Sequence, residues 1–177
     1  RQRLPWLMIA VVLNLINASL LSIFEGTLAQ ITALVLFQPM ILGMAGNIGT
    51  QALAVTILGF HLETFDDSKL PKKHIFKELT IGLFNSTTLA LLSFGFVYTF
   101  LSFFPQGTQA PIEIATIVFI AVISSMFVAS SMGVFVPIMF HRFGKDPAVA
   151  SGPIMTTIND LVALMIYFGM ATFMFLA

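Results

Sequence analysis

The sequence contains no cysteine and very few charged residues. The absence of cysteine excludes disulfide frameworks and thiolate metal sites. Only 9% of the 177 residues are charged and 58% are hydrophobic, whereas soluble domains carry about 25% charged residues. Eight basic residues balance eight acidic ones, so the net charge is zero. The chain therefore lacks the excess of positive charge that is typical of nucleic-acid-binding proteins. This composition excludes an ordinary soluble domain and predicts an integral membrane protein.

The few charges are clustered, and they leave long apolar runs between them. Each run exceeds the roughly 20 residues that a helix needs to cross about 30 Å of hydrocarbon. The sequence therefore predicts an all-α membrane protein, a bundle of five spanning helices. The five runs are Leu4–Phe24, Gly26–Phe60, Leu79–Ile112, Ile114–Phe140 and Pro147–Ala177.

The basic residues predict how the bundle is oriented. With five crossings, all eight fall on one side of the membrane: Arg1, Arg3, Lys69, Lys72, Lys73, Lys77, Arg142 and Lys145. The positive-inside rule makes this side cytoplasmic, so we expect a cytoplasmic N-terminus and an outside C-terminus. The connector His61–His74 is then a solvated cytoplasmic loop or a contact surface for a cytosolic region. Because the chain starts at Arg1 and not at methionine, we also expect that an N-terminal part is missing.

Asp160 is the most informative residue, because it is the only charged residue in the last apolar run. A carboxylate near the centre of a membrane helix costs roughly 2.5–3.5 kcal/mol on insertion scales. Chains tolerate this cost mainly where the acid faces a water-filled path or an ion. No lysine or arginine lies in a helix interior to pair with it. We therefore predict that Asp160 contacts a permeating cation; the alternative is an interhelical hydrogen-bond cluster with Asp160 protonated or paired.

Other oxygen ligands share the Asp160 face of the fifth helix. Gly152, Thr156 and Asp160 follow one another at intervals of four residues, which places them on one broad helical face. Pro153 lacks the backbone donor that would bond the carbonyl of Val149, so that carbonyl is available. Carboxylate, hydroxyl and carbonyl oxygens on one face predict an oxygen-lined path.

A face of small and polar residues also runs along the second helix, through Gly43, Gly46, Asn47 and Thr50. Small residues at this spacing are typical of close helix packing in membranes. The same residues also suit a pore lining, because glycine exposes backbone carbonyls to a hydrated ion. The pattern favours neither reading over the other, and both can hold together. On the first helix, Asn14 and Asn17 share a face, and we expect them to hydrogen-bond to a neighbouring helix.

The available ligands are oxygens, which hard cations such as Mg²⁺ and Ca²⁺ prefer. Mg²⁺ gives up its waters reluctantly, so a polar path that contacts a hydrated ion suits a single carboxylate per subunit. Two copies of that carboxylate across a dimer axis would neutralise a divalent ion. An intramembrane aspartyl protease needs two acids within reach, and each chain has one intramembrane Asp, so we predict no enzyme activity.

Two long motifs resemble a known family. PMILGMAGNIGTQALAV is similar to the second-helix signature of the bacterial MgtE magnesium channels, and KDPAVASGPIMTTINDLVALMIYF is similar to their fifth-helix signature. FKELTIG resembles the start of their third helix, and RLPWL and FEGTLAQITALVLFQP also fit. The resemblance extends over essentially all of residues 1–177.

The resemblance implies an MgtE-type transmembrane pore domain that forms a homodimer, with the Mg²⁺ path at the subunit interface between helices two and five. It implies that Asp160 is the ion-binding aspartate, that Gly152 and Thr156 lie near the ion, and that Gly43, Gly46, Asn47 and Thr50 face the pore. Family members place an N-terminal domain and a pair of CBS domains before the membrane part, and residues 1–177 match neither.

The predicted function is therefore that of a Mg²⁺-selective channel pore, which conducts hydrated Mg²⁺ passively into the cytoplasm across the bacterial inner membrane. Other divalent cations are further candidate ligands. The alternative is a divalent cation transporter coupled to H⁺ or Na⁺, with Asp160 as the exchanging acid.

Overall fold

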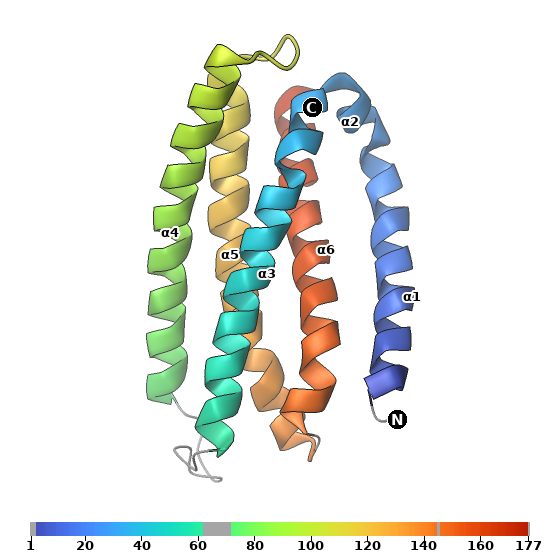
Figure 1. Ribbon diagram of the computed structural model, residues 1–177, viewed down its shortest axis with the longest axis vertical. Helices are drawn as coiled ribbons and strands as arrows, with labels where there is room; N and C mark the ends of the chain where they lie inside the picture. Colours follow the sequence, from blue (N-terminus) through green and yellow to red (C-terminus); the bar gives the residue numbers. More distant parts are fainter. Residues whose placement is uncertain (1–2, 62–71, 145, 177) are drawn as a thin grey trace.

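The computed structural model describes residues 3–61, 72–144 and 146–176, and within these ranges every regular element is helical (Figure 1). Five of the described helices are long and apolar enough to cross a membrane, which confirms the predicted fold class. The elements are α1 (Arg3–Leu21), η1 (Ser22–Phe24), α2 (Glu25–Gln30), α3 (Thr32–His61), α4 (Lys72–Phe103), α5 (Pro111–Arg142) and α6 (Pro147–Leu176).

The helix boundaries follow from local sequence signals. Pro111 begins α5, where its missing N–H would have no helical partner, and the Glu113 carboxylate accepts a hydrogen bond from the Ala110 N–H at 3.1 Å. Gly144 follows α5 with φ of +64°, a conformation that favours glycine. The segment after α1 differs from a simple turn: Glu25–Gln30 forms the separate short helix α2, and Ile31 leaves helical geometry with ψ of 78° before α3 begins.

Helix α5 is the centre of the bundle. Helices α3 and α4 each pack along α5 and touch one another little, whereas α6 packs against both α5 and α3. Helix α1 stands at the side of the bundle, and its main long-range partner is α6 (Figure 1). Half of the α5 span is buried inside the protein, compared with 6% of the span that contains α1.

Glycines allow α5 to approach its two main neighbours closely. A Cβ added to Gly133 would lie 2.8 Å from the Ala52 Cβ and 3.0 Å from the Leu53 backbone nitrogen of α3. One turn earlier on α5, Ser130 occupies the space next to Gly82 of α4. Close backbone approach at small residues is the usual way in which membrane helices associate.

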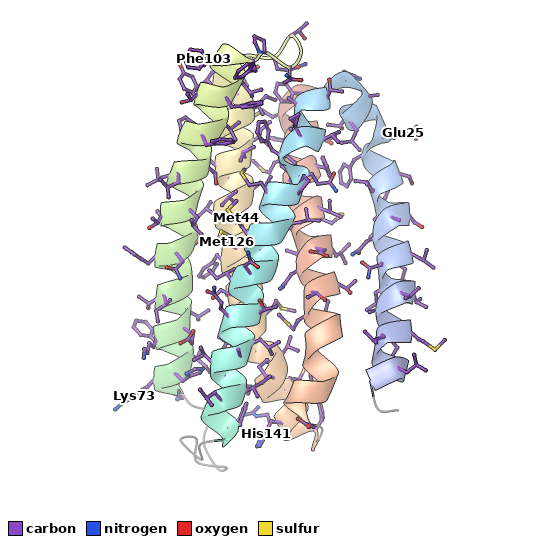
Figure 2. All side chains as sticks on the ribbon, in the orientation of Figure 1. Glu25, Met44, Lys73, Phe103, Met126 and His141 are labelled. Carbon is purple, nitrogen blue, oxygen red and sulfur yellow. The ribbon has the colours of Figure 1, made fainter. Side chains whose placement is uncertain are left out.

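The two ends of the bundle differ in charge. Figure 2 shows Lys73 and His141 at one end and Glu25 and Phe103 at the other. The N-terminus lies at the Lys73 end and the C-terminus at the opposite end, as an odd number of crossings requires (Figure 1). Most of the predicted connector His61–His74 lies outside the described residues, since these omit 62–71.

Candidate functional site

Asp160 lies on α6 with its side chain partly exposed, between the buried Asn159 and the partly exposed Leu161. One turn earlier, Thr156 is exposed, so a hydroxyl and a carboxylate follow one another along α6. Gly152, a further turn toward the N-terminus of α6, is helical; its surroundings are not among those that the structure describes. This part of α6 therefore offers oxygen ligands that remain accessible within the single chain.

A contact between α3 and α6 places these oxygens at the level of the polar residues of α3. Asn159 packs directly against Gly49, with no room for a Cβ there. Asp160 follows Asn159, and Thr50 follows Gly49, so Asp160 and Thr50 lie at the same height in the bundle. A Cβ on Gly49 would also lie 3.2 Å from the Ala129 carbonyl oxygen, so the Asn159 amide is packed between α3 and α5.

The polar residues of α3 share one face, and this face is open among the described residues. Gly43, Asn47 and Thr50 are exposed and Gly46 is partly exposed. The Thr50 hydroxyl donates to the carbonyl oxygens of Gly46 at 2.9 Å and of Asn47 at 3.0 Å. A Cβ on Gly43 or Gly46 would meet nothing within 4 Å, so these two glycines do not pack helices together among the residues that the structure describes. We call Gly43, Gly46, Asn47 and Thr50 the open face of α3.

Toward the other end of the bundle, α3 and α6 are joined by a buried hydrogen bond. The Tyr167 hydroxyl donates to the Leu34 carbonyl oxygen at 2.9 Å, and Tyr167 itself is fully buried. This contact and the Asn159–Gly49 contact hold the two helices at two heights. The pairing of α3 and α6 therefore fixes where Asp160 lies relative to the open face.

The first helix supports α6 next to the site. The buried Asn17 amide donates to the Thr157 carbonyl oxygen at 3.3 Å, which confirms the predicted contact with a neighbouring helix. The matching prediction for Asn14 is wrong, because its amide donates to the Ala10 carbonyl oxygen of its own helix at 2.9 Å. Asn14 is exposed and three residues earlier on α1, where no neighbouring helix accepts the bond within the described residues.

Sequence reasoning did not single out the role of Asn159 or of Gly49. Asn159 is 2% exposed, and neither its amide nitrogen nor its amide oxygen has a hydrogen-bond partner among the described residues. Such an orphaned group costs about 1–3 kcal/mol. The charge of the neighbouring Asp160 is visible in the sequence, whereas the burial of the neutral Asn159 is not. A single sequence also carries no signal for which helix a given glycine contacts.

The comparisons with known proteins cover this site. The MgtE family, described as "Divalent cation transporter", matches residues 38–170, which include all of the residues discussed on the open face of α3 and on α6. The chain belongs to the MgtE family.

Three relatives named "Magnesium transporter MgtE" match over nearly the whole chain. The protein of Bacillus subtilis is 36% identical over 97% of the chain, that of Enterococcus faecalis is 33% identical over 97%, and that of Thermus thermophilus is 31% identical over 96%. These matches cover 36%, 36% and 35% of the relatives, so the chain spans about a third of their length.

The arrangement suits a particular kind of ligand. Its side-chain donors are a carboxylate, hydroxyls and an amide, and its glycines leave backbone carbonyls uncovered. Hard cations bind oxygen ligands of this kind, whereas softer transition metals favour thiolate or imidazole, which the site lacks among its described residues. The ligand chemistry of these residues is therefore that of a hard cation and not of a soft one.

Proposed function

We propose that this MgtE-family chain forms a Mg²⁺-conducting path across the membrane, with Asp160 as the residue that contacts the ion. The observation that carries the proposal is the position of Asp160: a partly exposed carboxylate in an apolar helix, at the height of the exposed Thr50 of α3. The names of the relatives favour Mg²⁺ among the hard cations.

The ion passes this point largely hydrated. Mg²⁺ demands six oxygens in octahedral geometry and dehydrates reluctantly, and one carboxylate with a few neutral oxygens does not replace that shell. The Asp160 carboxylate and the Thr156 hydroxyl oxygen then accept hydrogen bonds from the waters of the ion. Backbone oxygens near Gly152 extend the path along α6, and the open face of α3 lines the remainder.

Two chains form the path together. A single Asp160 leaves a divalent ion half neutralised, whereas two copies related by a twofold axis supply both charges. Like charges that face one another repel when the site is empty, so cation entry is favoured. The open face of α3 supports a homodimer as well, because polar groups at membrane depth occur where they are covered by protein or line a hydrated cavity.

We place this dimer in the bacterial plasma membrane with the N-terminus cytoplasmic, on the distribution of the basic residues. Conduction is then passive and directed inward by the membrane potential. At 100 mV the potential favours inward movement by about 2.3 kcal/mol per elementary charge, and the ion carries two.

The test is Mg²⁺ flux into liposomes that contain the protein, wild type beside Asp160→Asn. Loss of a hydrogen bond to a charged group costs about 1.5–3 kcal/mol, so we expect flux to fall by about tenfold to a hundredfold. Glu25→Gln removes an exposed carboxylate from α2, away from the site, and serves as the matched control with unchanged flux.

The same preparation separates a channel from a coupled transporter. A channel continues to conduct down the Mg²⁺ gradient after the pH and Na⁺ gradients are collapsed, whereas a coupled transporter stops. Wild-type flux in Asp160→Asn would reject Asp160 as the contact residue.

A further inference from the structure

A cavity with several polar residues in its lining lies on the side of α3 that faces α4, away from Asp160. It has a volume of about 170 Å³ and lies between α3 and α4, with α5 as its floor. Its polar lining residues are Gln51 of α3, Glu78 and Asn85 of α4, and Ser130 of α5. We call this space the Glu78 cavity. Since roughly 10–15 Å³ of such volume accommodates one water, the cavity has room for a cation together with several waters.

The cavity follows from the way in which the helices pack. Helices α3 and α4 touch one another little, because each packs mainly along α5. Gly82 lets α4 approach Ser130, and Gly133, one turn later on α5, lets α3 approach. A gap therefore stays open between α3 and α4 next to Ser130.

The buried Glu78 needs an explanation. Glu78 directly follows Lys77 near the start of α4, yet Lys77 is exposed, whereas Glu78 is 8% exposed and lines the cavity. Glu78 is the only ionisable residue among the described residues that line it. A carboxylate buried at a membrane helix is costly unless a positive charge compensates it, and the other polar groups of the lining are neutral.

Glu78 has titratable neighbours on its own helix, among them the exposed Lys77 and the partly exposed His74. His74 lies one turn before Glu78 and interacts with it electrostatically, but the His74 Nε2 is also 3.0 Å from the Thr56 hydroxyl of α3. His74 is not among the residues that line the cavity. None of the described residues that line the cavity carries a positive charge, so a bound cation would supply one there.

We propose that the Glu78 cavity binds a hard cation, with the Glu78 carboxylate supplying the charge and the Gln51, Asn85 and Ser130 side chains supplying neutral oxygens. Glu78, Gly82 and Asn85 follow one another at four and three residues, so the acid and the amide share one face of α4. Carboxylate, amide and hydroxyl oxygens form a ligand set for Na⁺ or for partly hydrated Mg²⁺.

This site is distinct from the proposed conduction path, although the two share α3. Gln51 follows Thr50 directly, so neighbouring residues of α3 contribute to the cavity and to the open face. A cation bound in the cavity links α3 to α4, and it thereby fixes the helix that carries Asn47 and Thr50. The proposal needs neither a dimer nor conduction through Asp160.

Cation binding to the purified protein in detergent at pH 8 tests the proposal, in an Asp160→Asn background that removes the other intramembrane carboxylate. One arm measures Mn²⁺ by the electron paramagnetic resonance signal of the free ion, and the other measures Na⁺ by the relaxation of its nuclear magnetic resonance signal. We expect saturable binding of one of these ions, at one per chain, and a loss of at least tenfold in affinity when Glu78→Gln is added. The arm that responds identifies the ion as divalent or monovalent.

Two further variants make the result decisive. Glu25→Gln, in the same background, removes an exposed carboxylate outside the cavity and should leave the affinity unchanged. Asn85→Ala removes a neutral ligand and no charge, and it should weaken binding several-fold even if Glu78→Gln does not fold. Absence of saturable binding of both ions in the Asp160→Asn protein, or equal affinities with and without Glu78, overturns the proposal. Flux through Asp160 is measured separately, so either site can fail without the other.

Discussion

Gly43 and Gly49 belong to the same helix and to the same run of small residues, yet they meet opposite surroundings. A Cβ on Gly43 would have nothing within 4 Å, whereas one on Gly49 would run into the Asn159 amide and lie 3.2 Å from the Ala129 carbonyl oxygen. Small residues in this helix thus have two roles. On one face they let neighbouring helices approach, and on the other they leave backbone uncovered between polar side chains.

The same contrast recurs with polar residues of α1. Asn17 is buried and bonds α6, and Asn14 is exposed and bonds its own helix. On α3 and on α1, the same residue type thus occurs on two faces of one helix. The neighbouring helix determines whether the residue makes a contact there. Each pair therefore provides a variant and its matched control.

The largest difference in stability is expected between the variants Gly133→Val and Gly43→Val. Gly133 faces the backbone of α3, and backbone atoms cannot move aside as a flexible side chain can. Overpacking of this kind destabilises by about 1–3 kcal/mol or more, so we expect a clearly lower unfolding midpoint in detergent for Gly133→Val. Gly43→Val introduces the same side chain on the open face and should change stability by about 0.5 kcal/mol or less. Equal losses for the two variants would mean that the open face of α3 is packed as tightly as the α5 contact.

A smaller difference in the free energy of unfolding is expected between the variants Asn17→Ala and Asn14→Ala. Side-chain hydrogen bonds between membrane helices contribute about 0.6 kcal/mol on average, with a maximum of about 1.7. Asn17→Ala should therefore destabilise by about that amount, measured as the free energy of unfolding in mixed micelles. Asn14→Ala removes a bond within one helix and should stay within about 0.5 kcal/mol of wild type. The account of α1 fails if Asn14→Ala is the more damaging change.

The sequence is sufficient to predict the helices, because their length and their apolar character are local properties. The boundary signals at Pro111 and Pro147 also work locally, and both helices begin there. The break at Ile31 is harder to predict from the sequence, since Glu25–Gln30 continues a helical pattern. The change of chain direction there depends on how α2 packs against α6. The polar faces of α3 and α6 are likewise visible as helical periodicity.

The contacts between helices cannot be predicted from local sequence patterns. Nothing local distinguishes Gly49, which faces Asn159, from Gly46, which faces open space. Glu78 illustrates the same limit: three lysines are its neighbours in sequence, and its burial becomes visible only once α4 is packed against the other helices. Both cases depend on which helices are neighbours, and a single sequence does not encode that in any short pattern.

The most direct test of the conduction path is the reactivity of single cysteines on α3 toward a water-soluble cationic thiol reagent, in liposomes with and without Mg²⁺. The chain has no cysteine of its own, so Thr50→Cys can be compared with Leu92→Cys, a position 64% exposed on the apolar surface of α4. We expect Thr50→Cys to react and Leu92→Cys to be inert. Mg²⁺ at ten times its Kd should slow the reaction at Thr50→Cys by about tenfold, since only about a tenth of the sites remain empty, and Asp160→Asn should abolish this protection. A cysteine at position 50 that is as inert as one at position 92, or whose labelling is indifferent to Mg²⁺, would contradict the path.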